Sequence, residues 1–122
     1  MKGEEFLQLA ERGDWRQVEL ELHREPTLIG ARDPEGRTAL HYAAIYGHAD
    51  LADELLRLGA EPNVGTSSGL TPLHLACENN RPTVVDVLLA GGAEANIPTR
   101  DGDAPLHVAA ASGQAEIVRT LL

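Results

Sequence analysis

The segment Gly36-Arg-Thr-Ala-Leu-His-Tyr-Ala-Ala44 recurs twice further along the chain. It returns as Gly69-Leu-Thr-Pro-Leu-His-Leu-Ala-Cys77 and as Gly102-Asp-Ala-Pro-Leu-His-Val-Ala-Ala110. The three histidines of these segments, His41, His74 and His107, are spaced 33 residues apart. Self-similarity at a fixed period of this length is typical of repeat architectures, in which similar units stack in a row.

Each copy predicts two short helices. In the first helix, Leu40 and Ala43-Ala44 fall on one apolar stripe, and the other two copies keep this spacing. The second helix carries a wider stripe that includes Leu51 and Leu55-Leu56. A pair of short helices cannot bury both stripes alone, so the units must stack on one another. The sequence therefore predicts an all-α repeat solenoid of helix-turn-helix units.

The breaks between these helices also follow the repeat. Thr71 before Pro72 predicts a helix start, with a hydroxyl cap and a proline at the first helical position. Gly47, Asn80 and Gly113 stand between the paired helices, where a left-handed residue is needed. Stretches that contain Gly, Ser and Asp predict turns at 33–37, 66–70 and 99–103.

This pattern resembles the ankyrin repeat, which has a period of 33 residues and a Thr-Pro-Leu-His-x-Ala core. The match is strong over residues 33–122, whereas residues 4–32 form a weaker copy without the Thr-Pro-Leu-His segment. The resemblance implies a single ankyrin repeat domain over 1–122. It comprises an N-terminal capping repeat (1–32), two full repeats (33–65 and 66–98) and a C-terminally truncated repeat (99–122). It also implies that the turns are the tips of short β-hairpin fingers.

The chain departs from the family pattern at a few positions. Thr66 and Thr99 stand where Asp is frequent, Ala39 replaces Pro, and Ala104 replaces Thr. Each change removes a small local device, so we expect the last unit to be the least stable. Because the chain ends at Leu122, within the second helix of that unit, we expect either a longer array or another chain that covers this end.

The net negative charge of the chain argues against some classes of binding partner. The chain has 10 basic and 19 acidic residues among 122, a net charge of −9, and no cluster of Lys and Arg. Nucleic acid and anionic membranes are therefore not expected as partners, whereas a protein with a basic patch is. We find no targeting signal, and a single cysteine, Cys77, fits a reducing compartment. We expect a cytoplasmic monomer.

Several residues are of types found in metal or catalytic sites, but their positions in the repeat argue against such roles. The three repeat histidines could suggest zinc, but the repeat should hold them about 10 Å apart, so we expect buried structural histidines that bond their own loops. Gly65-Thr-Ser-Ser-Gly69 matches the nucleophile-elbow pattern around Ser67 but lies in a turn, not between a strand and a helix. We therefore expect no enzyme, metal, cofactor or small-molecule substrate.

Positions that vary between units while the framework stays constant are the candidate contacts for a protein partner. In the family, such contacts lie on the fingers and on the concave face of the first helices. The candidates on the fingers are Pro34, Glu35, Arg37, Ser67, Ser68, Leu70, Arg100, Asp101 and Asp103. The candidates on the first helices are Ile45, Tyr46, Glu78, Asn79, Ala111 and Ser112.

Ile45 and Tyr46 are the favoured anchors, because an exposed tyrosine beside an apolar residue is typical of an interface. The alternative is that Tyr46 only packs across to the capping repeat near Arg12. The leading functional hypothesis is a non-catalytic protein–protein interaction module. The alternative is a regulatory or targeting segment of a larger enzyme or channel.

Overall fold

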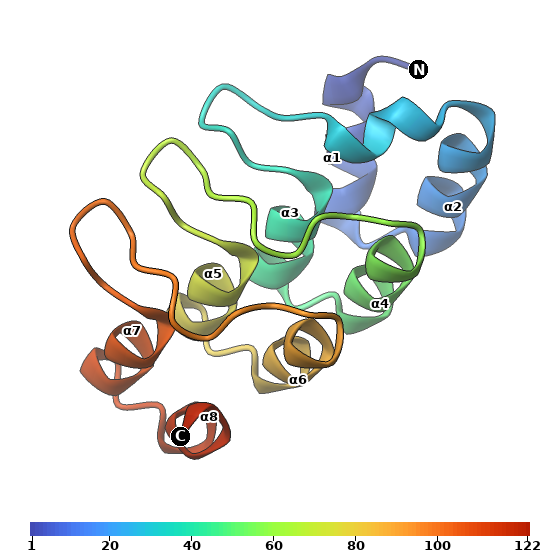
Figure 1. The fold of residues 1–122 in the computed structure, drawn as a ribbon. Helices are drawn as coiled ribbons and strands as arrows, with labels where there is room; N and C mark the ends of the chain where they lie inside the picture. The colour runs from blue at the N-terminus through green and yellow to red at the C-terminus, as the bar shows by residue number, and fades with distance from the viewer.

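Helices arranged in two parallel rows make up the molecule (Figure 1). The computed structural model describes residues 1–122 as eight α-helices and one 3-10 helix, with no β-strand. In chain order these are α1 (Gly3–Arg12), α2 (Trp15–Arg24), η1 (Pro26–Gly30), α3 (Ala39–Tyr46), α4 (Ala49–Arg57), α5 (Pro72–Glu78), α6 (Pro82–Ala90), α7 (Pro105–Ala111) and α8 (Ala115–Leu121). None of the α-helices is both long and apolar enough to cross a membrane.

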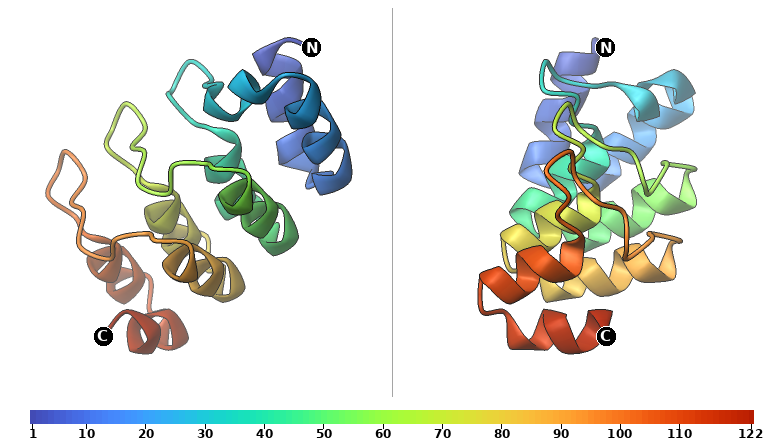
Figure 2. Two further views of the ribbon diagram at one scale, coloured as in Figure 1. Left: turned by 45° about the vertical axis from the view of Figure 1, so that its right-hand side comes forward. Right: turned by 60° about the vertical axis from the view of Figure 1, so that its left-hand side comes forward.

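The two rows follow from which helices pack together. The inner row is α1, α3, α5 and α7, and the outer row is α2, α4, α6 and α8, with each helix contacting the next member of its own row. Each inner helix also packs on the outer helix that follows it. Figure 2 shows that the stack is elongated and that its ends are far apart. The predicted all-α repeat solenoid is confirmed.

The core lies between the rows and between successive pairs. Leu40, Leu55 and Leu73 are fully buried there. Ala43 and Ala76 are also fully buried and allow neighbouring inner helices to approach closely. The last pair contributes far less to this core, because only Pro105 and Ala109 of α7 and Ile117 of α8 are buried.

The helix ends have the predicted residues. Thr71 caps α5 and Pro72 is its first residue; the Thr71 hydroxyl accepts a hydrogen bond from the backbone N–H of His74 at 3.3 Å. Asn80 is the one non-glycine residue with a positive φ, 55°, in the turn where Gly47 and Gly113 stand in the neighbouring units. This turn reverses the chain between the inner and the outer helix.

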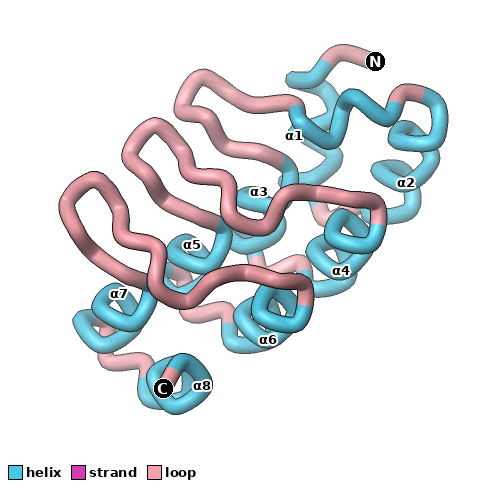
Figure 3. Tube along the Cα trace, in the orientation of Figure 1, coloured by secondary structure: helices cyan, strands magenta, loops and turns pink.

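The fingers project from one side of the stack as loops, not as the expected β-hairpins (Figure 3). In the second finger, the N–H of Thr66 donates to the carbonyl of Leu70 at 2.9 Å, and that of Gly69 to the carbonyl of Thr66 at 2.8 Å. The other two fingers close in the same way, from Asp33 to Arg37 and from Thr99 to Asp103. These bonds make a turn, but no further pairs extend it into a ladder, so no strand forms.

The threonines at the base of two fingers do part of the work of an aspartate. The Thr66 hydroxyl accepts bonds from the backbone N–H groups of Ser68, at 3.3 Å, and Leu70, at 3.2 Å. Thr99 accepts one from the N–H of Asp103, at 3.2 Å. These positions therefore lose only part of the local device, because a hydroxyl oxygen can cap the same turn but accepts fewer bonds than the Asp33 carboxylate does.

Candidate protein-binding surface

The candidate contact residues lie mainly at the surface. Twelve of the fifteen are exposed, and only Arg37, Ile45 and Leu70 are half-buried. Eight of them line one groove of about 370 Å³, which we call the finger groove. Its walls are the first and second fingers and its floor is formed by α3 and α5. These eight are Glu35, Arg37, Ile45, Ser67, Ser68, Leu70, Glu78 and Asn79.

The remaining candidates lie outside the finger groove. Pro34 faces the other side of the first finger, and Tyr46 is 42% exposed near the end of α3. The remaining candidates lie on the third finger and at the C-terminal end of α7, and all are exposed: Arg100, Asp101, Asp103, Ala111 and Ser112. The structure thus brings together the candidates of the first two full units and leaves those of the last unit apart.

Hydrogen bonds between neighbouring fingers hold the walls of the groove. The backbone N–H of Ser67 donates to the carbonyl of Glu35 at 2.9 Å, and its hydroxyl donates to the same oxygen at 3.0 Å. The N–H of Arg100 donates to the carbonyl of Ser68 at 3.1 Å. At Gly36, where φ is 81°, an added Cβ would lie 3.2 Å from the backbone nitrogen of Ser67. Glycine therefore permits both the turn and the close approach of the next finger.

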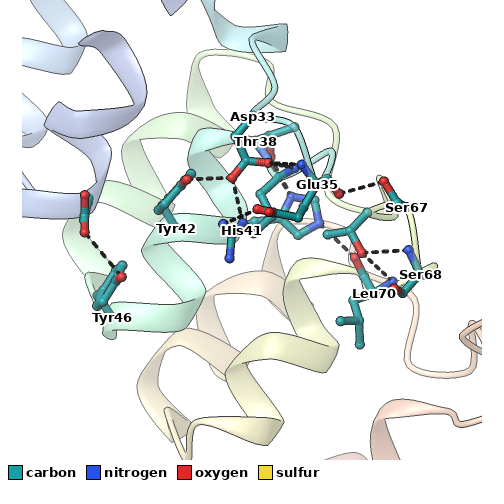
Figure 4. A network of polar contacts seen from close by, with 12 residues as sticks. Asp33, Glu35, Thr38, His41, Tyr42, Tyr46, Ser67, Ser68 and Leu70 are labelled. Atoms are coloured by element: carbon teal, nitrogen blue, oxygen red, sulfur yellow. Dashed lines mark hydrogen bonds and ion pairs between the residues drawn. The ribbon is translucent and has the colours of Figure 1, made fainter. Parts of the chain in front are cut away.

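A polar network centred on Asp33 fixes the first finger (Figure 4). One carboxylate oxygen accepts from the Tyr42 hydroxyl at 2.6 Å and from Nε of Arg37 at 2.7 Å. The other accepts from the backbone N–H groups of Arg37 at 2.8 Å and Glu35 at 3.0 Å. Arg37 also pairs with the Glu35 side chain. The wall of the finger groove is thus held in a defined conformation.

This network shifts the acidity of its members. Burial alone would raise the pKa of Asp33, but the hydrogen bonds from Tyr42 and Arg37 outweigh it and lower that pKa to about 2. Burial and the bond to Asp33 raise the pKa of Tyr42 to about 12. The bond to Asp33 also raises the pKa of Arg37. Asp33 and Arg37 are therefore both charged, and Tyr42 is neutral, at physiological pH.

The repeat histidines differ from one another. His41 and His74 are fully buried, and each bonds its own cap and also the next finger, which goes beyond the expected bond within one loop. His107 is exposed, contrary to expectation, because no further unit packs on α7. No group of three or more His, Cys, Asp or Glu residues is arranged to hold a metal ion.

Two other residues, Ser67 and Cys77, are of types that can act as nucleophiles, but their contacts in the structure argue against that role. The Ser67 hydroxyl is engaged with the Glu35 carbonyl and has no histidine among its hydrogen-bond partners. Cys77 is buried on α5, and burial raises the pKa of its thiol to about 11. The thiol is therefore protonated at neutral pH, which suppresses its reactivity as a nucleophile.

The two favoured anchors have different environments. Tyr46 reaches the capping repeat, as the alternative expected, and its hydroxyl donates there to the carboxylate of Glu11, the residue before Arg12, at 3.4 Å. Its ring stacks on Tyr42 with centroids 6.5 Å apart and planes 13° apart. Ile45 is half-buried and packs against the core. Tyr46 is therefore the better anchor, because truncating Ile45 would also remove core packing.

A second groove, of about 490 Å³, lies between α1 and the first finger, and we call it the cap groove. Leu7, Gln8 and two glutamates of α1 line one side, and residues of the first finger line the other. The sequence analysis did not count Glu4 and Glu11 among the candidate contacts, because they lie in the capping repeat, which is a weaker copy of the unit. Their spacing of seven residues, which places both on one face of a helix, was the available signal.

Comparison with known proteins identifies the family to which the chain belongs. A family model for ankyrin repeats in three copies matches residues 6–99 and 54–122. A serine/threonine-protein kinase of Arabidopsis thaliana, VIK, is 41% identical over 54 residues, which is 44% of this chain. The chain spans only 12% of the length of that kinase. Ankyrin repeats generally bind protein partners. With its 33-residue period, stacked helix pairs and this family match, the chain belongs to the ankyrin repeat family.

Proposed function

We propose that this chain is a non-catalytic protein-interaction module that binds its partner in the finger groove. The observation that supports this most directly is the convergence of eight unit-variable residues on one groove. The groove has half-buried apolar side chains, Ile45 and Leu70, beside exposed polar ones such as Ser68 and Asn79. An apolar centre with a polar rim is the usual composition of a protein interface.

The mechanism is rigid presentation. The bonds from Ser67 to Glu35 and from Arg100 to Ser68 connect the fingers before any partner arrives. The Asp33 network does the same for the Arg37 side chain. Side chains already held in place lose less conformational entropy on binding, which favours affinity. Ser67, by this proposal, serves as a link between fingers and not as a nucleophile.

A selection from a displayed library of small protein binders tests this function. Binders selected against the chain are challenged with the double variant Ser68→Arg/Asn79→Arg, which fills the finger groove with two long side chains. We expect most binders to lose at least about tenfold in affinity, equivalent to about 1.4 kcal/mol.

The matched control is Thr83→Arg/Asn96→Arg, which adds the same charge at exposed positions outside the groove. We expect binding to this control to match the unmodified chain. Binders that tolerate the groove variant as well as the control would refute the finger groove as the main contact surface.

A second candidate function is that of a repeat segment that regulates or targets a larger enzyme or channel. The match to a stretch of a much longer kinase favours it. The complete reading frame of the gene tests this candidate: an adjoining catalytic or channel domain supports it, and a frame that encodes repeats alone contradicts it.

We also propose that the protein is cytoplasmic and monomeric. The single cysteine, which is buried and unpaired, is compatible with a reducing compartment. Cell fractionation tests the location, and sedimentation equilibrium tests the oligomeric state; a secreted protein or a stable dimer would contradict this proposal.

A further inference from the structure

We propose that the Asp101-Gly102 pair at the tip of the third finger is a modification site, at which Asp101 isomerises spontaneously to isoaspartate. This inference is independent of the proposed function. Asp101 is the only aspartate or asparagine of the chain that precedes a glycine. Both residues are exposed, so water reaches the pair freely. A glycine nitrogen is the most accessible backbone nucleophile, because no side chain shields it.

The reaction needs only these two residues and water. The backbone nitrogen of Gly102 attacks the side-chain carboxyl carbon of Asp101. An N–Cγ bond forms, a Cγ–O bond breaks, and the hydroxyl leaves with the amide proton as water, which closes a succinimide ring. Water then opens the ring at either carbonyl. Breaking the N–Cγ bond restores aspartate, whereas breaking the bond to the backbone carbonyl carbon gives isoaspartate. One water is released and one is consumed, and nothing is oxidised or reduced.

The carboxyl group of Asp101 is free to react. It belongs to none of the ion pairs of the molecule and accepts no hydrogen bond. Asp33, at the base of the first finger, is the opposite case, because its carboxylate accepts bonds from Tyr42, Arg37 and the finger backbone. The residue after it is Pro34, which has no backbone N–H to react.

The third finger is also the one that no further finger holds. In the second finger, the carbonyl of Ser68 accepts from the N–H of Arg100 at 3.1 Å. The carbonyl of Asp101, the equivalent residue of the third finger, accepts no bond. An added Cβ at Gly69 would lie 3.1 Å from the backbone nitrogen of Arg100, whereas at Gly102 nothing lies within 4 Å. The tip of the third finger therefore has room to change conformation.

One hydrogen bond opposes the reaction. The N–H of Gly102 donates to the carbonyl of Thr99 at 2.9 Å, and this turn bond must open before the nitrogen can attack. The turn leads into α7 and α8, the pair that buries the fewest residues, and exposed turns open more readily than core helices do. In the second finger, the equivalent bond from Gly69 to Thr66 must open against the neighbouring finger as well.

Isomerisation would change the third finger itself. Isoaspartate adds one carbon to the main chain and moves the free carboxylate to the α position. The turn closes with a bond from the N–H of Thr99 to the carbonyl of Asp103 at 2.9 Å, and that carbonyl also lies 2.8 Å from Nε2 of His74. A longer chain between Thr99 and Asp103 therefore alters the surface of the finger and weakens its connection to α5.

Ageing of the full chain in water labelled with heavy oxygen tests the proposal. The chain is kept at pH 7.4 and 37 °C for several weeks and is then digested with a protease that cleaves after glutamate. Mass spectrometry with electron-transfer fragmentation distinguishes isoaspartate from aspartate. We expect isoaspartate at residue 101, together with one heavy oxygen atom from the water that opened the ring. The other aspartates should stay unchanged.

Two variants separate the contributions of sequence and structure. Asp101→Glu keeps the charge and gives the third finger the Glu-Gly pair of the first, and the product should disappear because a longer side chain closes the ring poorly. Ser68→Asp creates a second Asp-Gly pair in the second finger, which should isomerise at least about threefold more slowly than Asp101-Gly102 of the same molecule. Both positions are exposed, so an unchanged midpoint of urea unfolding verifies folding.

The inference is overturned if isoaspartate forms mainly at another residue, if no heavy oxygen enters residue 101, or if Asp101→Glu leaves the amount of isoaspartate unchanged. Equal rates for the two Asp-Gly pairs of the Ser68→Asp variant would overturn the role of the open edge of the third finger. None of these results bears on the finger groove, which the library binders test separately.

Discussion

Nε2 of His74 donates a hydrogen bond to the carbonyl oxygen of Asp103, 2.8 Å away and 29 residues further along the chain. The direction is fixed because Nδ1 of the same ring accepts from the backbone N–H of Thr71, at 3.0 Å. His41 makes the same bond to the carbonyl of Leu70 at 2.9 Å, again across 29 residues. Each ring therefore connects the cap of its own inner helix to the next finger.

This relationship predicts unequal effects of one substitution at two equivalent positions. His74→Ala should lower the free energy of unfolding by roughly 2–5 kcal/mol, because it leaves the buried N–H of Thr71 without a partner and removes the bond to the carbonyl of Asp103. His107→Ala should cost less than about 1 kcal/mol, because that ring is exposed and accepts only from the N–H of Ala104. Urea unfolding measures both, and equal losses would show that the bond to the next finger contributes nothing.

The buried histidines also predict a pH dependence. Burial lowers the pKa of His41 from 6.5 to about 4 and lowers that of His74. Between pH 6.5 and 4 the unfolded chain therefore binds protons that the folded chain excludes, and stability falls as the pH falls. At pH 5, His41 alone should account for about 2 kcal/mol.

Urea unfolding at pH 7.5 and pH 5.0 measures this dependence, with His41→Gln as the comparison. Glu54 acts in the opposite direction, because burial and the neighbouring Glu19 carboxyl group raise its pKa. The difference between the unmodified chain and the variant isolates His41, since Glu54 is common to both. If the stability of the two proteins changes equally with pH, the histidine is not the source.

The Asp33 network predicts the effect of removing one hydroxyl. Tyr42→Phe should raise the pKa of Asp33 from about 2 towards 3.8 and cost roughly 1–3 kcal/mol, because a hydrogen bond to a charged group is lost. Carboxyl NMR titration and urea unfolding measure the two effects. Tyr46→Phe is the control, since its hydroxyl is more distant from Glu11 and exposed; comparable losses in both variants would contradict the network.

Burial along the stack predicts a gradient of local stability. Backbone amides of α7 and α8 should exchange with solvent faster than those of α3 and α5, because the last pair buries only Pro105, Ala109 and Ile117. Native-state hydrogen exchange measures this directly. Uniform protection of all helices would mean that the stack opens only as a whole and that the low burial of the last pair has no local effect.

Much of the framework is predictable because it rests on local spacing. The stripe of Leu40, Ala43 and Ala44 recurs in all three copies, and the cap threonine, Thr71, in two of them. Both require only neighbouring residues. The exposure of His107 was not predictable in this way, because the same sequence motif is buried only where a further unit covers it. Whether a finger forms a β-hairpin or a loop depends on how many hydrogen bonds extend beyond its turn. The composition of the segment does not indicate that number.

Of the two grooves, the sequence predicts most of one and misses the other. Variation between copies identified eight residues of the finger groove, because a position that differs between aligned units is not required for the shared fold. The comparison between copies did not identify the cap groove, because Glu4 and Glu11 lie in the weaker copy of the repeat, over residues 4–32. The sequence analysis gave Tyr42 no role, although it lines that groove and its hydroxyl donates to Asp33.

The equal reach of the two histidine bonds has an evolutionary consequence. Removing residues 66–98 as one block would bring His41 to the carbonyl of Asp103 and the backbone N–H of Arg100 to the carbonyl of Glu35, so both of these bonds would be re-formed with equivalent atoms. Gain or loss of a whole unit thus preserves these hydrogen bonds between neighbouring units, whereas an insertion of a few residues would break them. The array can change its length, and with it the ligands it accommodates, by duplication or excision of interchangeable blocks.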